Sequence, residues 1–138
     1  MLEESATPDL EVLVRQAYDS FNRGGVEPLL GLVAPNIVLD TDGPGRFEGK
    51  DSFRCCLMDW QEAFDEFAVE VEEAVDLGGG VAFVVLEQTG RPKGTSVQVR
   101  LRYANVGIMV DGEATHFTQS PDIDEARAAA ERPAQARG

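Results

Sequence analysis

The sequence has few of the residues that form metal centres or disulfide frameworks. Its 138 residues include one histidine, His116, and two cysteines, Cys55 and Cys56, that are adjacent in the chain. Adjacent cysteines have poor geometry for an ordinary disulfide bond, and a zinc site needs several spaced Cys or His ligands. We therefore predict two reduced thiols, no bound metal and no cofactor.

Basic residues are also scarce. Twelve Lys and Arg stand against 25 Asp and Glu, so the formal net charge is −13. A surface of this charge repels phosphate backbones and anionic lipid headgroups, which excludes nucleic acids and membranes as expected partners. The chain lacks an apolar run of the roughly 18 residues that a membrane span requires. Residues 1–8 contain no apolar stretch typical of a secretory signal, so we expect a cytoplasmic protein.

The remaining composition is that of an ordinary globular domain. Hydrophobic residues make up 43% of the chain and charged residues 27%, and a chain of this length buries roughly two-thirds of its unfolded surface. We predict a single domain over residues 1–138, with an ordered core at about residues 8–132 and a frayed tail at residues 133–138.

Helical patterns come first in the chain. Apolar residues recur at helical spacing up to Phe21, behind Thr7 as a candidate N-cap and Pro8 at the first helical position. A short second helix is predicted from Pro28 and ends before Pro35. A first strand and a loop separate it from a third helix, whose predicted inner stripe contains Phe53, Cys56, Leu57, Trp60, Ala63, Phe64 and Phe67.

Strand patterns follow the third helix, where apolar residues alternate with polar ones at the period of two. Residues 81–86 are apolar on both faces, which predicts a central strand covered on both sides. Residues 96–110 form one long strand pattern with a predicted bend at Gly107. Asp111-Gly112 predicts a hairpin back through residues 114–119.

This order of elements predicts an α+β domain. Helices precede an antiparallel meander, and a last helix is predicted at residues 123–132. In such a layout the helices lie on one face of the sheet. We expect a curved antiparallel sheet that closes with the helices over an apolar pocket.

One polar residue interrupts the inner face of the long strand. The odd-numbered positions there are mostly apolar, and Asn105 is a lone amide among them. A buried amide without a partner costs roughly 1–3 kcal/mol, so it needs the backbone, a side chain, water or a ligand. Asn105 is therefore either a core amide satisfied by the backbone or by Tyr18, or a neutral donor directed at a ligand carbonyl.

The even-numbered positions of the same strand become apolar near the hairpin, at Val106, Ile108 and Val110. An apolar patch on the outer face of a sheet indicates a partner, most simply a second copy of the chain. We therefore predict a homodimer through this outer face.

The end of the first strand carries the candidate general base. Asp40 and Thr41 lie there, and the register that decides which of them faces the pocket stays open. A carboxylate that faces an apolar cavity has a raised pKa, which suits a general base. The alternative is an ordinary solvated acid. Trp60 and Tyr18 lie on inward helical faces, either as core residues or as part of a ligand site.

Several segments together resemble the SnoaL-like proteins of the nuclear transport factor 2-like and ketosteroid isomerase-like superfamily. These segments are residues 14–25, 32–37, 47–53, Trp60 with Phe64 and Phe67, 103–106 leading to Asp111-Gly112, and 122–126. The resemblance implies a cone-shaped, strongly curved antiparallel sheet, with N-terminal helices packed over its concave face and a pocket between them. It also implies dimerisation through the sheet, a donor or acid site at Asn105 and a base at Asp40 or Thr41, while the family's helix-one tyrosine falls nearer Ala17 than Tyr18. Our candidate catalytic residues are Asp40, Asn105 and Tyr18. The candidate pocket residues are Trp60, Tyr103, Phe117 and Gln119.

Two functions are compatible with these residues. In the first, the protein binds a small, largely apolar carbonyl compound and catalyses its isomerisation or cyclisation by proton transfer, with Asp40 as base and Asn105 and Tyr18 as neutral donors to the oxyanion. In the second, it is a non-catalytic ligand-binding or dimeric interaction module. The two differ in whether Asp40 and Asn105 face the same cavity.

Overall fold

The computed structural model describes residues 10–41 and 45–137. Within them the helices are α1 (Leu10–Asn22), α2 (Glu27–Leu30), α3 (Lys50–Glu62) and α4 (Ile123–Arg137). The strands are β1 (Val33–Asp40), β2 (Arg46–Glu48), β3 (Phe64–Gly78), β4 (Val81–Pro92), β5 (Val99–Val110) and β6 (Glu113–Ser120). The helix predicted to end near residue 132 continues to Arg137, and the predicted N-cap at Thr7 lies outside the described residues.

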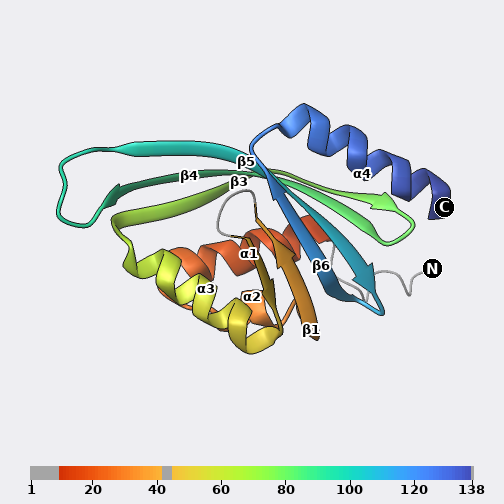
Figure 1. Ribbon diagram of the computed structural model, residues 1–138, viewed down its shortest axis with the longest axis horizontal. Coiled ribbons are helices and arrows are strands. Elements are labelled where there is room, and N and C mark those ends of the chain that lie inside the picture. Colours follow the sequence, from red (N-terminus) through yellow and green to blue (C-terminus); the bar gives the residue numbers. More distant parts are fainter. Residues whose placement is uncertain (1–9, 42–44, 138) are drawn as a thin grey trace.

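The strands form one sheet in the order β2-β1-β6-β5-β4-β3. Neighbouring strands are antiparallel except β1 and β6, which run parallel. A parallel pair needs a long crossover connection, and α3 with the β3–β5 meander provides it. The sheet curves around α1, α2 and α3, so the predicted α+β architecture with N-terminal helices over the concave face is confirmed (Figure 1).

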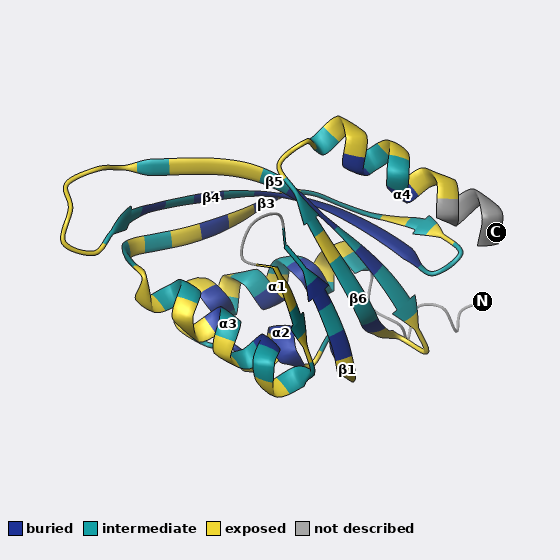
Figure 2. Ribbon diagram, in the orientation of Figure 1, coloured by how far each residue is buried: buried dark blue, intermediate teal, exposed yellow. Residues whose placement is uncertain are grey.

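The last helix lies on the other face of the sheet, so the expectation that all helices share one face is wrong (Figure 1). Ala126 and Ala130 of α4 pack against the outward side chains of β4, among them Phe83. β4 is apolar on both faces and residues 81–86 are buried, as predicted, so both faces need a cover (Figure 2). The small alanines let the helix approach the sheet closely.

This helix also contacts part of the predicted dimer surface. Val106 and Ile108 pack against the cluster of apolar residues that α4 completes and are half-buried, whereas Val110 is 47% exposed. The outer face at these residues is therefore partly occupied within one chain, and Val110 is the most open of the three.

Two element boundaries differ from the predicted ones. β1 begins at Val33 and includes Pro35, where the pairing with β6 is irregular, as expected for a proline inside a strand. The predicted stripe of the third helix extends too far, because Phe64 and Phe67 belong to β3. A positive φ of 55° at Glu66 and a break in the β3–β4 register accompany this transition. Helical spacing did not reveal it, because Phe67 still packs against the core and the Phe64 ring lies 5.6 Å from the Phe67 ring, measured between centroids.

Strand β3 forms one edge of the sheet, and side chains of α1 bond to the backbone of this strand at Val69 and Val71. Asn22 donates to the Val69 carbonyl oxygen at 2.8 Å and accepts from the Val69 N–H at 2.7 Å. Arg15 donates to the Val71 carbonyl oxygen at 2.6 Å. These bonds attach α1 to the sheet and fix the position of the helix face that carries Tyr18.

No helix within the described residues combines the length and the apolar composition that crossing a membrane requires.

Candidate functional site

A cavity of about 100 Å³, here called the chamber, lies between the concave face of the sheet and α1, α2 and α3. Leucine and aromatic side chains of the helices form one wall, and β1, β4, β5 and β6 form the other. Gly107 of β5 is required in this wall, because a Cβ atom there would lie 2.9 Å from the Phe117 ring. The chamber is thus an apolar enclosure in the position that the sequence predicts.

Asn105 provides a polar group inside this enclosure. The inward pleat of β5 directs it into the chamber, where the residue is 8% exposed. Its Oδ1 atom is buried and accepts no hydrogen bond from any described residue. Neither the backbone nor a described side chain donates to this oxygen, and an amide oxygen buried without a donor costs roughly 1–3 kcal/mol.

Tyr18 of α1 lines the same chamber, so the structure brings Tyr18 and Asn105 together. Burial raises the pKa of Tyr18 to about 12, and hydrogen bonding with the Asn105 side chain acts in the opposite direction. The phenol therefore stays neutral at physiological pH. It can donate or accept a hydrogen bond, but it does not supply a charge.

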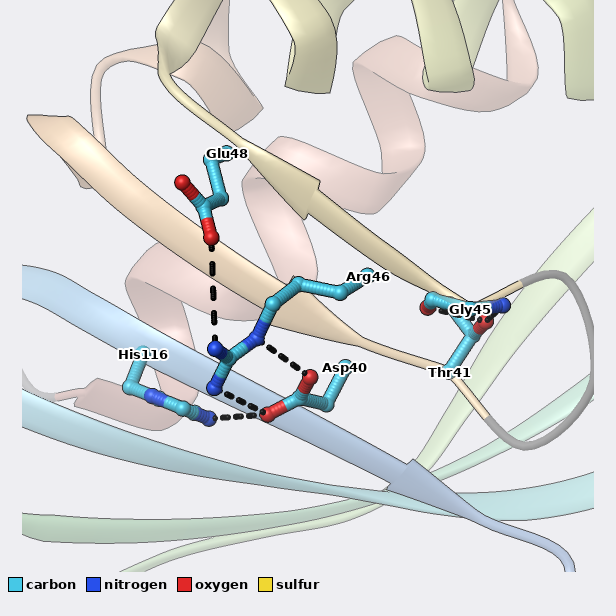
Figure 3. A network of polar contacts seen from close by, with 6 residues as sticks. All are labelled: Asp40, Thr41, Gly45, Arg46, Glu48 and His116. Atoms are coloured by element: carbon cyan, nitrogen blue, oxygen red, sulfur yellow. Dashed lines mark hydrogen bonds and ion pairs between the residues drawn. The ribbon is translucent and has the colours of Figure 1, made fainter.

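Asp40 lies on the opposite face of the sheet. Because side chains alternate along a strand, Leu39 lines the chamber and Asp40 points away from it. Its carboxylate accepts a hydrogen bond from Arg46 Nε at 2.9 Å and lies 2.7 Å from His116 Nε2 (Figure 3). The neighbouring Thr41 hydroxyl donates to the Gly45 carbonyl oxygen at 2.7 Å, so it too has a partner outside the chamber.

These contacts reverse the pKa shift expected for a base. The hydrogen bond from Arg46, and to a smaller extent the contact with His116, hold the pKa of Asp40 below its ordinary value. The condition for a raised pKa of Asp40 is therefore not met, because its carboxylate contacts Arg46 and His116 instead of facing an apolar cavity. The catalytic role of Asp40 remains a prediction that its position does not support.

The predicted pocket residues lie close together. Trp60, Phe117 and Gln119 line the chamber, and Tyr103 lies in an adjoining pocket that also includes Trp60 and Gln119. The Tyr103 hydroxyl is buried and has no hydrogen-bond partner among the described residues. Sequence reasoning missed the contact between His116 and Asp40, which are 76 positions apart, because only the pairing of β1 with β6 brings them together.

The described residues that line the chamber include no Asp, Glu, Lys, Arg or His. Cys56 is among them, and burial raises the pKa of its thiol, with the Asp59 charge acting in the same direction. The chamber therefore offers hydrogen bonds from neutral groups and an apolar surface. Its described wall does not offer a proton acceptor that ionises near neutral pH.

A wider groove of about 640 Å³ lies beside α4, on the other face of the sheet. Its two arginines are already paired, since Arg127 binds Glu73 through two hydrogen bonds of 2.7 and 2.9 Å and Arg102 binds Glu72. The described residues that line this groove include none with an unpartnered buried polar atom, so the chamber is the better candidate site.

The curved sheet, the helices over its concave face and the chamber between them define the nuclear transport factor 2-like class. Within it, the chain belongs to the SnoaL-like domain family, whose model matches residues 14–117. No curated protein matches the chain.

Solved structures agree on the fold. A protein of unknown function from Burkholderia pseudomallei K96243 is 17% identical with a TM-score of 0.72, over 90% of this chain and 98% of that one. A protein from Catenulispora acidiphila DSM 44928, in complex with trimethylamine, is 14% identical with a TM-score of 0.70, over 89% and 95% of the two chains. TerC, co-crystallised with polyporic acid, is 15% identical with a TM-score of 0.68, over 88% and 97%. At sequence identities this low, the similarity to these structures shows the fold alone.

Proposed function

We propose that this protein binds a small, neutral, largely apolar molecule in the chamber through a hydrogen bond from the ligand to Asn105. The observation that supports this proposal most directly is the buried Oδ1 atom of Asn105, a residue that lines the chamber; this atom has no hydrogen-bond donor among the described residues. A ligand N–H or O–H removes the cost of this unpaired oxygen. The uncharged, apolar wall favours a neutral ligand, because a buried charge needs a partner.

A binding function accounts for the chamber better than proton transfer does. An isomerase or cyclase of the expected kind needs a base within hydrogen-bonding reach of its substrate. Asp40 points away from the chamber and is paired with Arg46 and His116. The binding of trimethylamine and polyporic acid by proteins of this fold supports a small-molecule role.

An NMR titration with pyrrole and furan tests the proposal. The two rings have nearly the same shape, but only pyrrole has an N–H that Asn105 can accept. We expect pyrrole to shift the amide resonances of residues around the chamber, including Gly107, and to bind roughly three- to tenfold more tightly than furan. Asn105→Leu should remove this difference.

Asn36→Leu is the matched control, because Asn36 is exposed on β1 and the same substitution there leaves the chamber intact. The preference for pyrrole should survive in this variant. Equal shifts with both rings, or no shift with either up to tens of millimolar, would contradict the proposal. Native mass spectrometry of protein from its own host then identifies the retained ligand.

We also propose that two chains associate through the part of the outer sheet face that α4 leaves open. The exposure of Val110 beside the half-buried Ile108 supports this interface. Light scattering should give twice the mass of one chain at micromolar concentration, and Val110→Lys should shift the mass towards one chain. A single-chain mass for the unmodified protein would contradict the dimer.

A further inference from the structure

A second pocket, here called the vestibule, adjoins the chamber. It has a volume of about 280 Å³ and lies beside β4, β5 and the end of β6, where Leu101 is 51% exposed. Trp60 and Gln119 line both compartments. The vestibule therefore opens at the surface, and these two side chains separate it from the chamber.

The vestibule contains its own unpartnered polar groups. The Tyr103 hydroxyl is buried without a partner. Gln88 of β4 is 3% exposed, and its side chain forms no hydrogen bond with a described residue. Arg102 reaches the rim, but its guanidinium binds Glu72 at 2.7 Å. The hydrogen-bonding groups that remain free for a ligand are thus neutral, as in the chamber.

The chamber alone is small for a ligand site. Its volume of about 100 Å³ is below the roughly 150 Å³ of a cavity that holds benzene and below the usual range of roughly 300–1,000 Å³ for ligand pockets. Chamber and vestibule joined reach the lower part of that range. Tyr103 and Asn105 lie two residues apart on the same face of β5, so one ligand roughly 7 Å longer than a small ring can reach both.

We propose that the natural ligand is an elongated neutral molecule that passes Trp60, with a donor on Asn105 in the chamber and a polar end on Tyr103 and Gln88 in the vestibule. This inference rests on the proposed binding function and specifies the shape and polarity of the ligand. The Trp60 side chain has to move for such a ligand to pass from the vestibule into the chamber. Its ring is half-buried and lies 5.2 Å from the Phe67 ring and 6.2 Å from the Tyr103 ring, both measured between centroids.

Three probes of increasing length test this arrangement: pyrrole, 2-phenylpyrrole and 2-(4-hydroxyphenyl)pyrrole. Pyrrole tests the Asn105 end of the site, the phenyl group is long enough to extend past Trp60, and the distal hydroxyl is placed to reach the vestibule. Trp60 is the only tryptophan, so its single indole N–H resonance reports passage. We expect the two longer probes to shift this resonance, and the hydroxylated one to bind roughly three- to tenfold more tightly than its phenyl counterpart.

Substitutions in the vestibule test whether its residues cause this gain in affinity. Tyr103→Phe should reduce the gain from the distal hydroxyl to about one, and Gln88→Leu provides a second test at the same end. Gln98→Leu is the matched control for Gln88→Leu, because Gln98 is exposed and does not line the vestibule, so the same substitution there should leave the gain unchanged. If pyrrole binds but the distal hydroxyl brings no gain in affinity, the extended site is wrong and only the binding in the chamber is supported. The same conclusion follows if the gain survives both vestibule variants. If pyrrole itself does not bind, the proposed function fails.

Discussion

The two faces of the sheet differ in whether their polar side chains have partners. On the convex face two carboxylates have side-chain partners: Asp40 contacts Arg46 and His116, and Glu73 binds Arg127. On the concave face, Asn105 and Tyr103 are neutral, and each buries a polar atom that has no partner. Buried polar groups are normally satisfied, so the unpaired ones support the proposal that a ligand binds on this face. The paired charges of the convex face have a structural explanation that needs no ligand.

The largest expected effect comes from placing a charge on the concave face. Asn105→Asp introduces a carboxylate into a chamber with no cation in its described wall, so burial should raise its pKa. Such a group is protonated in the folded state and costs nothing below about pH 4, and stability is lost as the pH rises. We expect the free energy of unfolding at pH 7 to fall by roughly 2–4 kcal/mol.

Urea denaturation between pH 4 and pH 8 measures this loss. Asn36→Asp on the exposed part of β1 is the control and should show little pH dependence relative to the wild type. A flat pH profile for Asn105→Asp would mean that the chamber is solvated, which would remove the contrast between the two faces.

A smaller effect, of opposite sign, is expected from removing an unpaired group. Tyr103→Phe deletes a buried hydroxyl that has no partner and keeps the shape of the ring. We expect the free energy of unfolding to stay equal or to rise by up to about 1–2 kcal/mol, because no hydrogen bond is lost and a buried polar group is removed. Thermal or urea denaturation without ligand measures it. A clear loss of stability would show that the hydroxyl has a partner.

The smallest effect is expected on the convex face. Asp40→Asn removes a solvent-accessible carboxylate whose pKa is lowered, chiefly by Arg46. A group with a lowered pKa stabilises the fold above its ordinary pKa and loses that contribution in acid. The small difference in stability between wild type and Asp40→Asn should therefore be constant near pH 7 and vanish between about pH 5 and pH 2.

For Asp40→Asn, a ligand-binding measurement distinguishes the two roles of Asp40 more clearly than a stability measurement does. Asp40 does not line the chamber, so the affinity for pyrrole should be the same in Asp40→Asn and in the wild type. If Asp40→Asn instead abolished a measurable isomerisation, the convex carboxylate would be catalytic, and the division between a binding face and a structural face would be wrong.

The sequence allows the concave face to be predicted well. Alternation along residues 96–110 assigns Asn105 to the inner face, and the helical stripe assigns Trp60 to the pocket, because both inferences use local periodicity. The orientation of Asp40 could not be obtained in this way, since a shift of one residue in a strand exchanges its two faces. Its partners come from strands that only the folded sheet brings beside it. The position of α4 was missed because its small apolar face, with Ala126 and Ala130, is compatible with either side of the sheet.

The bonds from Asn22 and Arg15 to β3 also limit how the protein can assemble. An uncovered edge strand is a template for strand addition and for amyloid-like aggregation. At this edge, the outward groups of Val69 and the carbonyl of Val71 are already bonded. The opposite edge is β2, which has three residues and offers little length for pairing. Growth of the sheet from one molecule into the next is therefore disfavoured at these positions, which agrees with the proposal that two chains associate through the open area of the convex face.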